Sequence, residues 1–248
     1  MDRPKVIWTN LKSKLRRGRR SIDIYRLGLT RDSAAARQQA VLMIQQRRER
    51  WSDVQDRFDE IVQGLGSGGL CLDFGANLGE FTERLAQTGA DVRAFEPDPY
   101  TFEKLQARMA HYPNVTLYNS AVGAEAGTLK MERHALFDED PEKYSVGTSA
   151  FSSVLAQAGG FSFEVEMVGF HDFIAAFDRP VDLVKMDIEG AEVAILEALL
   201  QRTTAQPIRA MFVETHEPQM PHLRLRLKAI RKALRPSAML QEIHLDWQ

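Results

Sequence analysis

The chain is poor in cysteine and lacks long apolar runs, and each absence removes a class of protein. One cysteine, Cys71, excludes an intrachain disulfide framework and a zinc site made of clustered cysteines. No apolar run approaches the roughly 18–20 residues that span a bilayer. No apolar segment of signal-peptide length follows the basic N-terminus either. We therefore expect no transmembrane helix, no cleaved signal and a cytoplasmic location.

Two phosphate-binding signatures are also missing. The turn Gly75-Ala-Asn-Leu-Gly79 has the spacing G-x-x-x-G, without the middle glycine of the dinucleotide fingerprint G-x-G-x-x-G. It is not a P-loop, because no G-x-x-x-x-G-K-[ST] is present at this turn. The spacing argues against a nicotinamide oxidoreductase, which stays open as a rival enzyme class.

Charge is divided unevenly along the chain. Residues 1–50 carry 14 basic and 4 acidic residues, whereas the remainder carries 18 basic and 30 acidic residues, a charge of −12. An acidic body matches nucleic acid poorly. Residues 1–32 are either a solvated basic tail, an organelle-targeting segment or a contact for an anionic membrane surface or polyanion. The last alternative predicts a peripheral membrane association, with or without catalysis.

From Leu70 onward, short apolar strands alternate with amphipathic helices, which is typical of a parallel sheet with helices on both faces. The expected strands are residues 70–74, 91–96, 115–121, 128–132, 163–168, 181–187, 208–214 and 239–245. The expected helices are residues 80–87, 99–110, 171–177, 191–200 and 223–234. We divide the chain into a basic arm with an amphipathic helix, residues 1–66, and an α/β domain, residues 67–248.

An apolar stripe runs along the helix predicted before this domain. Its members are Trp51, Val54, Phe58, Ile61 and Leu65, spaced 3, 4, 3 and 4. Such a stripe packs against its own domain or forms the seam of a homodimer.

The glycine turn and the strand after it predict a nucleoside site. The turn joins a buried strand to a helix, so the backbone can approach a ligand closely. Glu96 ends the next strand, 17 residues after Gly79, where a carboxylate accepts hydrogen bonds from ribose hydroxyls. A ligand with ribose hydroxyls and no pyrophosphate fits both features, and S-adenosylmethionine is the common cofactor of that kind.

Five motifs point to a family. They are DFGANLGEFT, AFEPDP, NSAVG, DLVKMDIEGAE and FVETHEP, and together they cover roughly residues 70–217. In this order they resemble the FkbM-type family of S-adenosylmethionine-dependent methyltransferases, VKMDIEGAE being the most distinctive. The resemblance implies a Rossmann-like class I methyltransferase fold and O-methylation of sugars or secondary metabolites. That class usually closes its sheet with an antiparallel pair, whereas one strand follows the last helix here.

The resemblance also implies cofactor residues. Asp73, Gly75, Asn77 and Gly79 are expected at the methionine end, and Glu96 at the ribose. The residues expected to border the adenine are Asn119, Ser120 and Ala121.

Catalytic candidates follow the two strands that end near Asp187 and Glu214. They are Lys185, Asp187, Glu189, Glu192, Glu214 and His216. We predict His216 as the general base, Asp187 as the residue that orients it or the acceptor, and Lys185 as the stabiliser of developing alkoxide charge.

Two alternatives stay open beside this assignment. We assign no metal, but His216 with Asp187, Glu189 and Glu214 is an oxygen-rich set that suits Mg²⁺ or Mn²⁺. The predicted activity is O-methylation of a hydroxyl on a glycan, glycolipid or small metabolite. A methyltransferase fold without activity, docking through its basic arm, is the alternative outside catalysis.

Overall fold

The computed structural model describes residues 52–133, 136, 137, 139, 161–216, 220–245 and 247. The basic arm, the first part of the predicted amphipathic helix and most of residues 134–160 lie outside this set. The chain divides into two compact units, Met1–Asp53 and Val54–Gln248. Our division at residue 66 stays a prediction.

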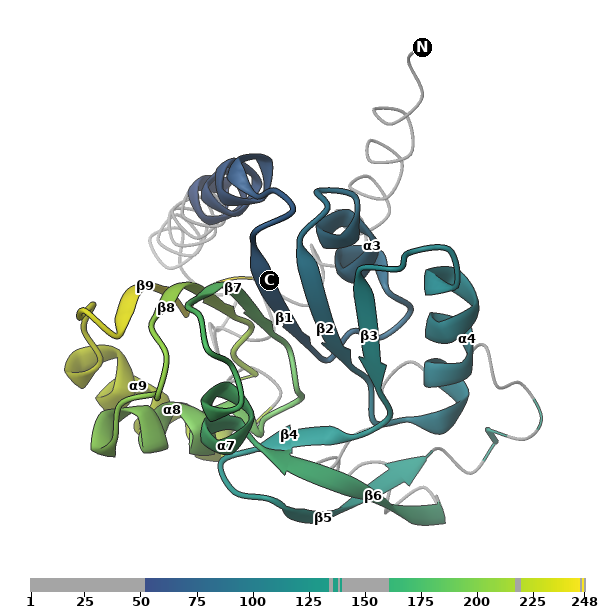
Figure 1. Cartoon of the computed structure of the whole chain (residues 1–248). Helices are drawn as coiled ribbons and strands as arrows, with labels where there is room; N and C mark the ends of the chain where they lie inside the picture. The colour runs from purple at the N-terminus through teal and green to yellow at the C-terminus, as the bar shows by residue number, and fades with distance from the viewer. Residues whose placement is uncertain are drawn as a thin grey trace, which may run out of the picture. The chain divides into compact units, whose positions relative to one another are not determined.

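A six-stranded parallel sheet forms the centre of the second unit, in the order β3-β2-β1-β7-β8-β9 (Figure 1). Its strands are β1 (Leu70–Phe74), β2 (Asp91–Phe95), β3 (Val115–Tyr118), β7 (Val181–Met186), β8 (Ile208–Val213) and β9 (Leu240–His244). The order places a topological switch point between β1 and β7, where ligands bind outside the carboxyl ends of the strands. The α/β prediction is confirmed, and every neighbouring pair in this sheet is parallel.

A second sheet lies at that carboxyl edge, and the sequence analysis did not separate it. It contains β4 (Ala121–Gly123), β6 (Phe161–Gly169) and β5 (Gly127–Arg133) in the order β4-β6-β5. In Figure 1 the arrowheads of β1, β2 and β3 point toward it. The predicted strand over residues 115–121 was therefore wrong at its end, because Ala121 pairs with Met167 of β6 and no longer with β2.

Helices cover both faces of the main sheet. The labelled helices are α3 (Glu80–Ala86), α4 (Pro99–Met109), α7 (Phe170–Ala175), α8 (Glu192–Gln201) and α9 (Arg224–Ala233). Alternation along β1 sends Leu70, Leu72 and Phe74 into a core shared with α7, α8 and α9. Cys71 points the other way, into a core shared with α3, and burial raises the pKa of its thiol. Cys71 thus serves as a buried apolar side chain of this core.

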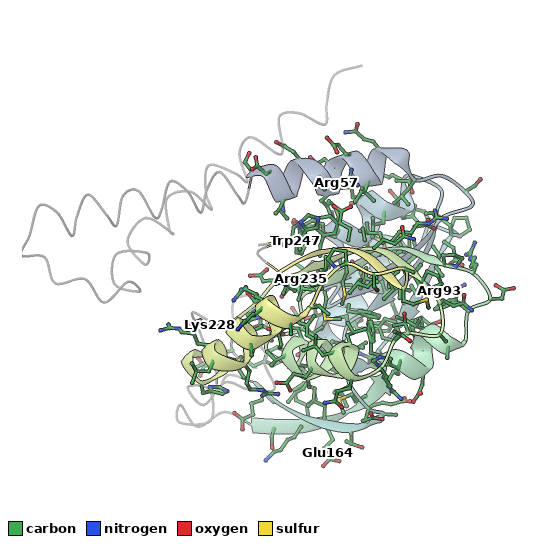
Figure 2. All side chains as sticks on the ribbon, turned by 90° about the vertical axis from the view of Figure 1, so that its left-hand side faces the viewer. Arg57, Arg93, Glu164, Lys228, Arg235 and Trp247 are labelled. Carbon is green, nitrogen blue, oxygen red and sulfur yellow. The ribbon has the colours of Figure 1, made fainter. Side chains whose placement is uncertain are left out.

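The helix at residues 52–64 belongs in part to this second core. Phe58 is fully buried and makes edge-to-face ring contacts with Phe81 and Phe212, and its ring lies 5.6 Å from that of Trp247. Figure 2 labels Arg57 on the same helix, where it forms an ion pair with Glu242 of β9. Four members of the predicted stripe, Val54, Phe58, Ile61 and Leu65, therefore pack within the unit that contains the sheet, and Trp51 lies outside the described residues.

The far edge of the main sheet is closed by one parallel strand. β9 pairs with β8 from Ile208–Leu240 to Phe212–His244. Within the part of the chain that the structure describes, none of the helices has the length and apolar character needed to cross a bilayer.

Candidate active site

A cleft that is open to solvent lies where the main sheet meets the small sheet. The glycine turn, the end of β2, the start of β4 and the segment after β7 all contribute to it. Residues from these elements are Gly75, Asn77, Glu96, Ser120, Ala121, Asp187 and Glu189. The predicted cofactor end and the predicted catalytic end thus share one cleft.

The glycine turn is held against the end of β7. Gly75 has φ +80°, and a Cβ at this position would lie 1.8 Å from the backbone oxygen of Asp187. The amides of Gly75 and Ala76 donate to the carbonyl oxygen of Phe95. These amides already have a protein acceptor, so they hold the turn in place.

Glu96 is the buried acid of the cleft, with 7% of its surface exposed. Its Oε2 accepts the Asn77 amide and its Oε1 accepts the Asp98 amide, both at 2.9 Å. Burial raises the pKa of Glu96 to about 7 although these two hydrogen bonds lower it. Each oxygen retains acceptor capacity, which is what a ribose diol requires.

The three residues predicted at the adenine differ in their placement. Ser120 and Ala121 line the cleft, where the small sheet begins. Asn119 does not line it, because its amide nitrogen donates to the carbonyl oxygens of Glu96 and Pro97. Asn119 therefore shapes the segment that carries Glu96.

Asp73 and Lys185 form a buried ion pair under the turn. Their side chains are 0% and 3% exposed, and Lys185 Nζ lies 3.2 Å from Asp73 Oδ1. Lys185 also donates to the Gly75 carbonyl, and Thr82 donates to Asp73 Oδ2. Burial lowers the pKa of Lys185, but the carboxylates of Asp73 and Asp187 outweigh it and the pKa is raised. Lys185 is thus a fixed cation, 3.9 Å from Asp187 Oδ2.

His216 lies beyond the end of β8, with 4% of its side chain exposed. Its Nε2 is 3.6 Å from Asp187 Oδ1 and 3.5 Å from Glu189 Oε2. Burial lowers its pKa, but the carboxylates of Glu192, Glu189 and Asp187 more than reverse this and raise the pKa to about 9. The structure therefore brings His216 and Asp187 together as predicted, with the ring behind the carboxylates that line the cleft.

Glu192 holds this histidine, a role that the sequence analysis did not assign. It is fully buried, and its Oε1 is 3.2 Å from both the amide nitrogen and Nδ1 of His216. Its Oε2 accepts the amide of Gly190 at 2.7 Å. An acid at the first position of an apolar helix, in the motif IEGAE, was the available signal.

The parallel sheet and its switch point define a Rossmann-like α/β fold. A model of the methyltransferase FkbM domain matches residues 73–235, more than half of the chain. The chain belongs to the FkbM family of methyltransferases.

Individual relatives are more distant. Methyltransferase sdnD of Sordaria araneosa is 25% identical over 186 residues, which cover 63% of this chain and 70% of the relative. Ribosomal RNA small subunit methyltransferase A of Thermotoga petrophila is 43% identical over 54 residues, 22% of this chain and 21% of the relative. An rRNA methylase structure from Streptococcus thermophilus aligns with 77% of this chain and 70% of its own, at 13% identity and a TM-score of 0.30.

Proposed function

We propose that this protein is an S-adenosylmethionine-dependent O-methyltransferase whose acceptor is a hydroxyl of a glycan, glycolipid or small metabolite. The observation that carries the proposal is the buried Glu96 carboxylate in a cleft that also contains Asp187. Family membership indicates the reaction class. Of the two acids, Glu96 would face the cofactor and Asp187 would face the acceptor.

The cleft fits the nucleoside part of this cofactor. Val122, Leu129 and Met131 form an apolar wall suited to an adenine ring, and Glu96 provides acceptors for the ribose hydroxyls. Near Glu96, the left-handed backbone of Asn77 at φ +52° directs its amide to the carboxylate. These residues would hold the nucleoside without any pyrophosphate contact.

When bound, S-adenosylmethionine supplies a methyl group on a sulfonium sulfur, and transfer forms a carbon–oxygen bond while the electron pair of the broken carbon–sulfur bond stays on sulfur. The chain must orient the acceptor oxygen and take its proton. Asp187 lines the cleft and His216 does not, so our proposal gives the proton to Asp187. His216 and Lys185 then act as positioning residues on its two oxygens.

Cofactor binding is tested by isothermal titration with S-adenosylhomocysteine. We expect binding that Glu96→Ala weakens strongly and that Glu103→Ala, a change of an exposed acid on α4, leaves unchanged. No binding by the unmodified protein, or equal binding by the Glu96 variant, would refute the cofactor assignment.

The acceptor is tested by transfer of a labelled methyl group from S-adenosylmethionine to glycan and metabolite extracts. Label in a base-stable ether, lost in Asp187→Asn, supports O-methylation. Label recovered only on nitrogen, or only in RNA, contradicts it.

A further inference from the structure

Three metal-ligating side chains converge at one end of the cleft. Asp187 and Glu189 follow β7, His216 follows β8, and one donor atom from each lies within 4.8 Å of the others. Asp187 and Glu189 line the cleft, so the space between the three donors opens toward the proposed acceptor position.

The spacing of the donors suits a small divalent ion. His216 Nε2 lies 3.6 Å from Asp187 Oδ1 and 3.5 Å from Glu189 Oε2, and one ligand atom from each residue lies within 4.8 Å of the others. With a third side of 4.8 Å, the point in the plane of the three atoms that is equidistant from them lies about 2.4 Å from each, and a shorter third side brings it closer, toward the usual oxygen distances of Mg²⁺. An ion would therefore fit with little movement of the ligands.

The burial and the partner of His216 give a further indication. Only 4% of its side chain is exposed, and its Nδ1 is hydrogen-bonded to Glu192. Nε2 faces the gap at distances longer than a good hydrogen bond from either carboxylate. A histidine with one nitrogen held by a buried carboxylate and the other directed at acidic oxygens is the arrangement that orients a metal-bound imidazole.

The local charge points the same way. Three carboxylates, those of Asp187, Glu189 and Glu192, surround one imidazole. Lys185 is a cation near Asp187, but it is closer to Asp73, at 3.2 Å against 3.9 Å. The three carboxylates therefore outnumber the one positive charge of the protonated imidazole. Partly buried negative charge in this excess is costly without a further cation.

We propose that Asp187, Glu189 and His216 bind one divalent cation of the Mg²⁺ or Mn²⁺ class, with Glu192 orienting the histidine. Two carboxylates and one imidazole suit these ions better than Zn²⁺, and three protein ligands leave positions for water and a substrate oxygen. Glu214, which we also considered as a ligand, is not in the converging set.

The role of the ion rests on the proposed function. In that reaction the ion would hold the acceptor hydroxyl oxygen and lower its pKa. Asp187 would take the proton, and the acceptor oxygen would form the bond to the methyl carbon as the carbon–sulfur bond breaks. Binding of the ion itself needs neither cofactor nor acceptor.

The test titrates Mn²⁺ into the chelator-treated full chain, followed by calorimetry and electron paramagnetic resonance, with and without S-adenosylhomocysteine. We expect one ion per chain, bound at least about tenfold more weakly by Asp187→Asn and His216→Gln. Glu192→Gln should weaken binding by about 10–100-fold without touching the ion. Glu189→Gln is the variant that should disturb folding least, because the Glu189 side chain is 48% exposed.

The matched control is Glu164→Gln, which removes the same charge from β6. Figure 2 labels Glu164 at the bottom of the view, on the small sheet, and its side chain is exposed. Unchanged Mn²⁺ affinity in this variant, with weaker binding in Glu189→Gln, supports the site. Equal affinity in the two variants, or no stoichiometric binding in either ligand state, overturns it. Mn²⁺ binding without S-adenosylhomocysteine binding keeps the site and refutes the proposed function.

Discussion

Ligand binding at Glu96 should depend on pH in the range where this buried acid titrates. Its pKa of about 7 means that about nine-tenths of the group is ionised at pH 8 and about one-tenth at pH 6. If ribose hydroxyls bind the carboxylate form, the dissociation constant rises about tenfold between pH 8 and pH 6, or about 1.4 kcal/mol. Because the pKa of Glu96 is raised in the folded protein, the stability of the fold depends on pH in the opposite direction. The contribution of Glu96 to the free energy of unfolding is fully present below its unfolded pKa and is lost as pH rises through about 7.

The assay uses 5′-methylthioadenosine, which carries the ribose but lacks the amino and carboxyl groups of the full cofactor. Isothermal titration at pH 6, 7 and 8 then reports the protein's own titration. In Glu96→Gln the dependence of affinity on pH should vanish, whereas Glu103→Gln should keep it. The free energy of unfolding of Glu96→Gln should fall by about 1–3 kcal/mol because the new amide faces the backbone amide of Asn77 or Asp98. An affinity that is constant from pH 6 to 8 in the unmodified protein would refute the reasoning.

Three further substitutions test the framework by thermal and chemical denaturation. Gly75→Ala should prevent stable folding or lower the melting temperature sharply, because the added methyl meets the Asp187 carbonyl; a native-like melting temperature would contradict this. Lys185→Met should cost about 3–5 kcal/mol by leaving Asp73 charged and unpaired, and adding Asp73→Asn should recover a large part; strictly additive losses would show that the pair is not coupled. Phe58→Ala should cost about 3–5 kcal/mol, and a loss below about 1 kcal/mol would mean that its helix does not pack on the sheet.

Local patterns predicted the order of the elements well. A run such as Leu70–Phe74 is apolar throughout because both faces of a parallel strand are covered, and its boundaries match the structure. The strand at residues 115–121 was extended too far because apolar residues return at Ala121 and Val122, after Asn119 and Ser120. What ends it is the switch of Ala121 to β6, a partner 46 residues further along.

The site was predictable in position but less so in the role of each side chain. Glu96 could be placed because it ends a strand at the edge where ligands bind. The engagement of Lys185 with Asp73 joins residues that are 112 positions apart on neighbouring strands, and no local pattern contains it. The role of Glu192 could not be predicted for the same reason, because it depends on a contact with His216, 24 residues away.

The proposed cofactor end and the proposed acceptor end of the cleft are joined through the backbone. Gly75 lies against the Asp187 carbonyl, the Asp187 amide donates to the Phe74 carbonyl, and Lys185 reaches from β7 to the Gly75 carbonyl. These contacts exist because β1 and β7 are neighbours at the switch point, although 106 residues separate Phe74 from Val181 at the strand ends. A shift of the glycine turn would therefore displace Asp187 as well, so nucleoside binding and positioning of the acceptor should fail together when this joint is altered.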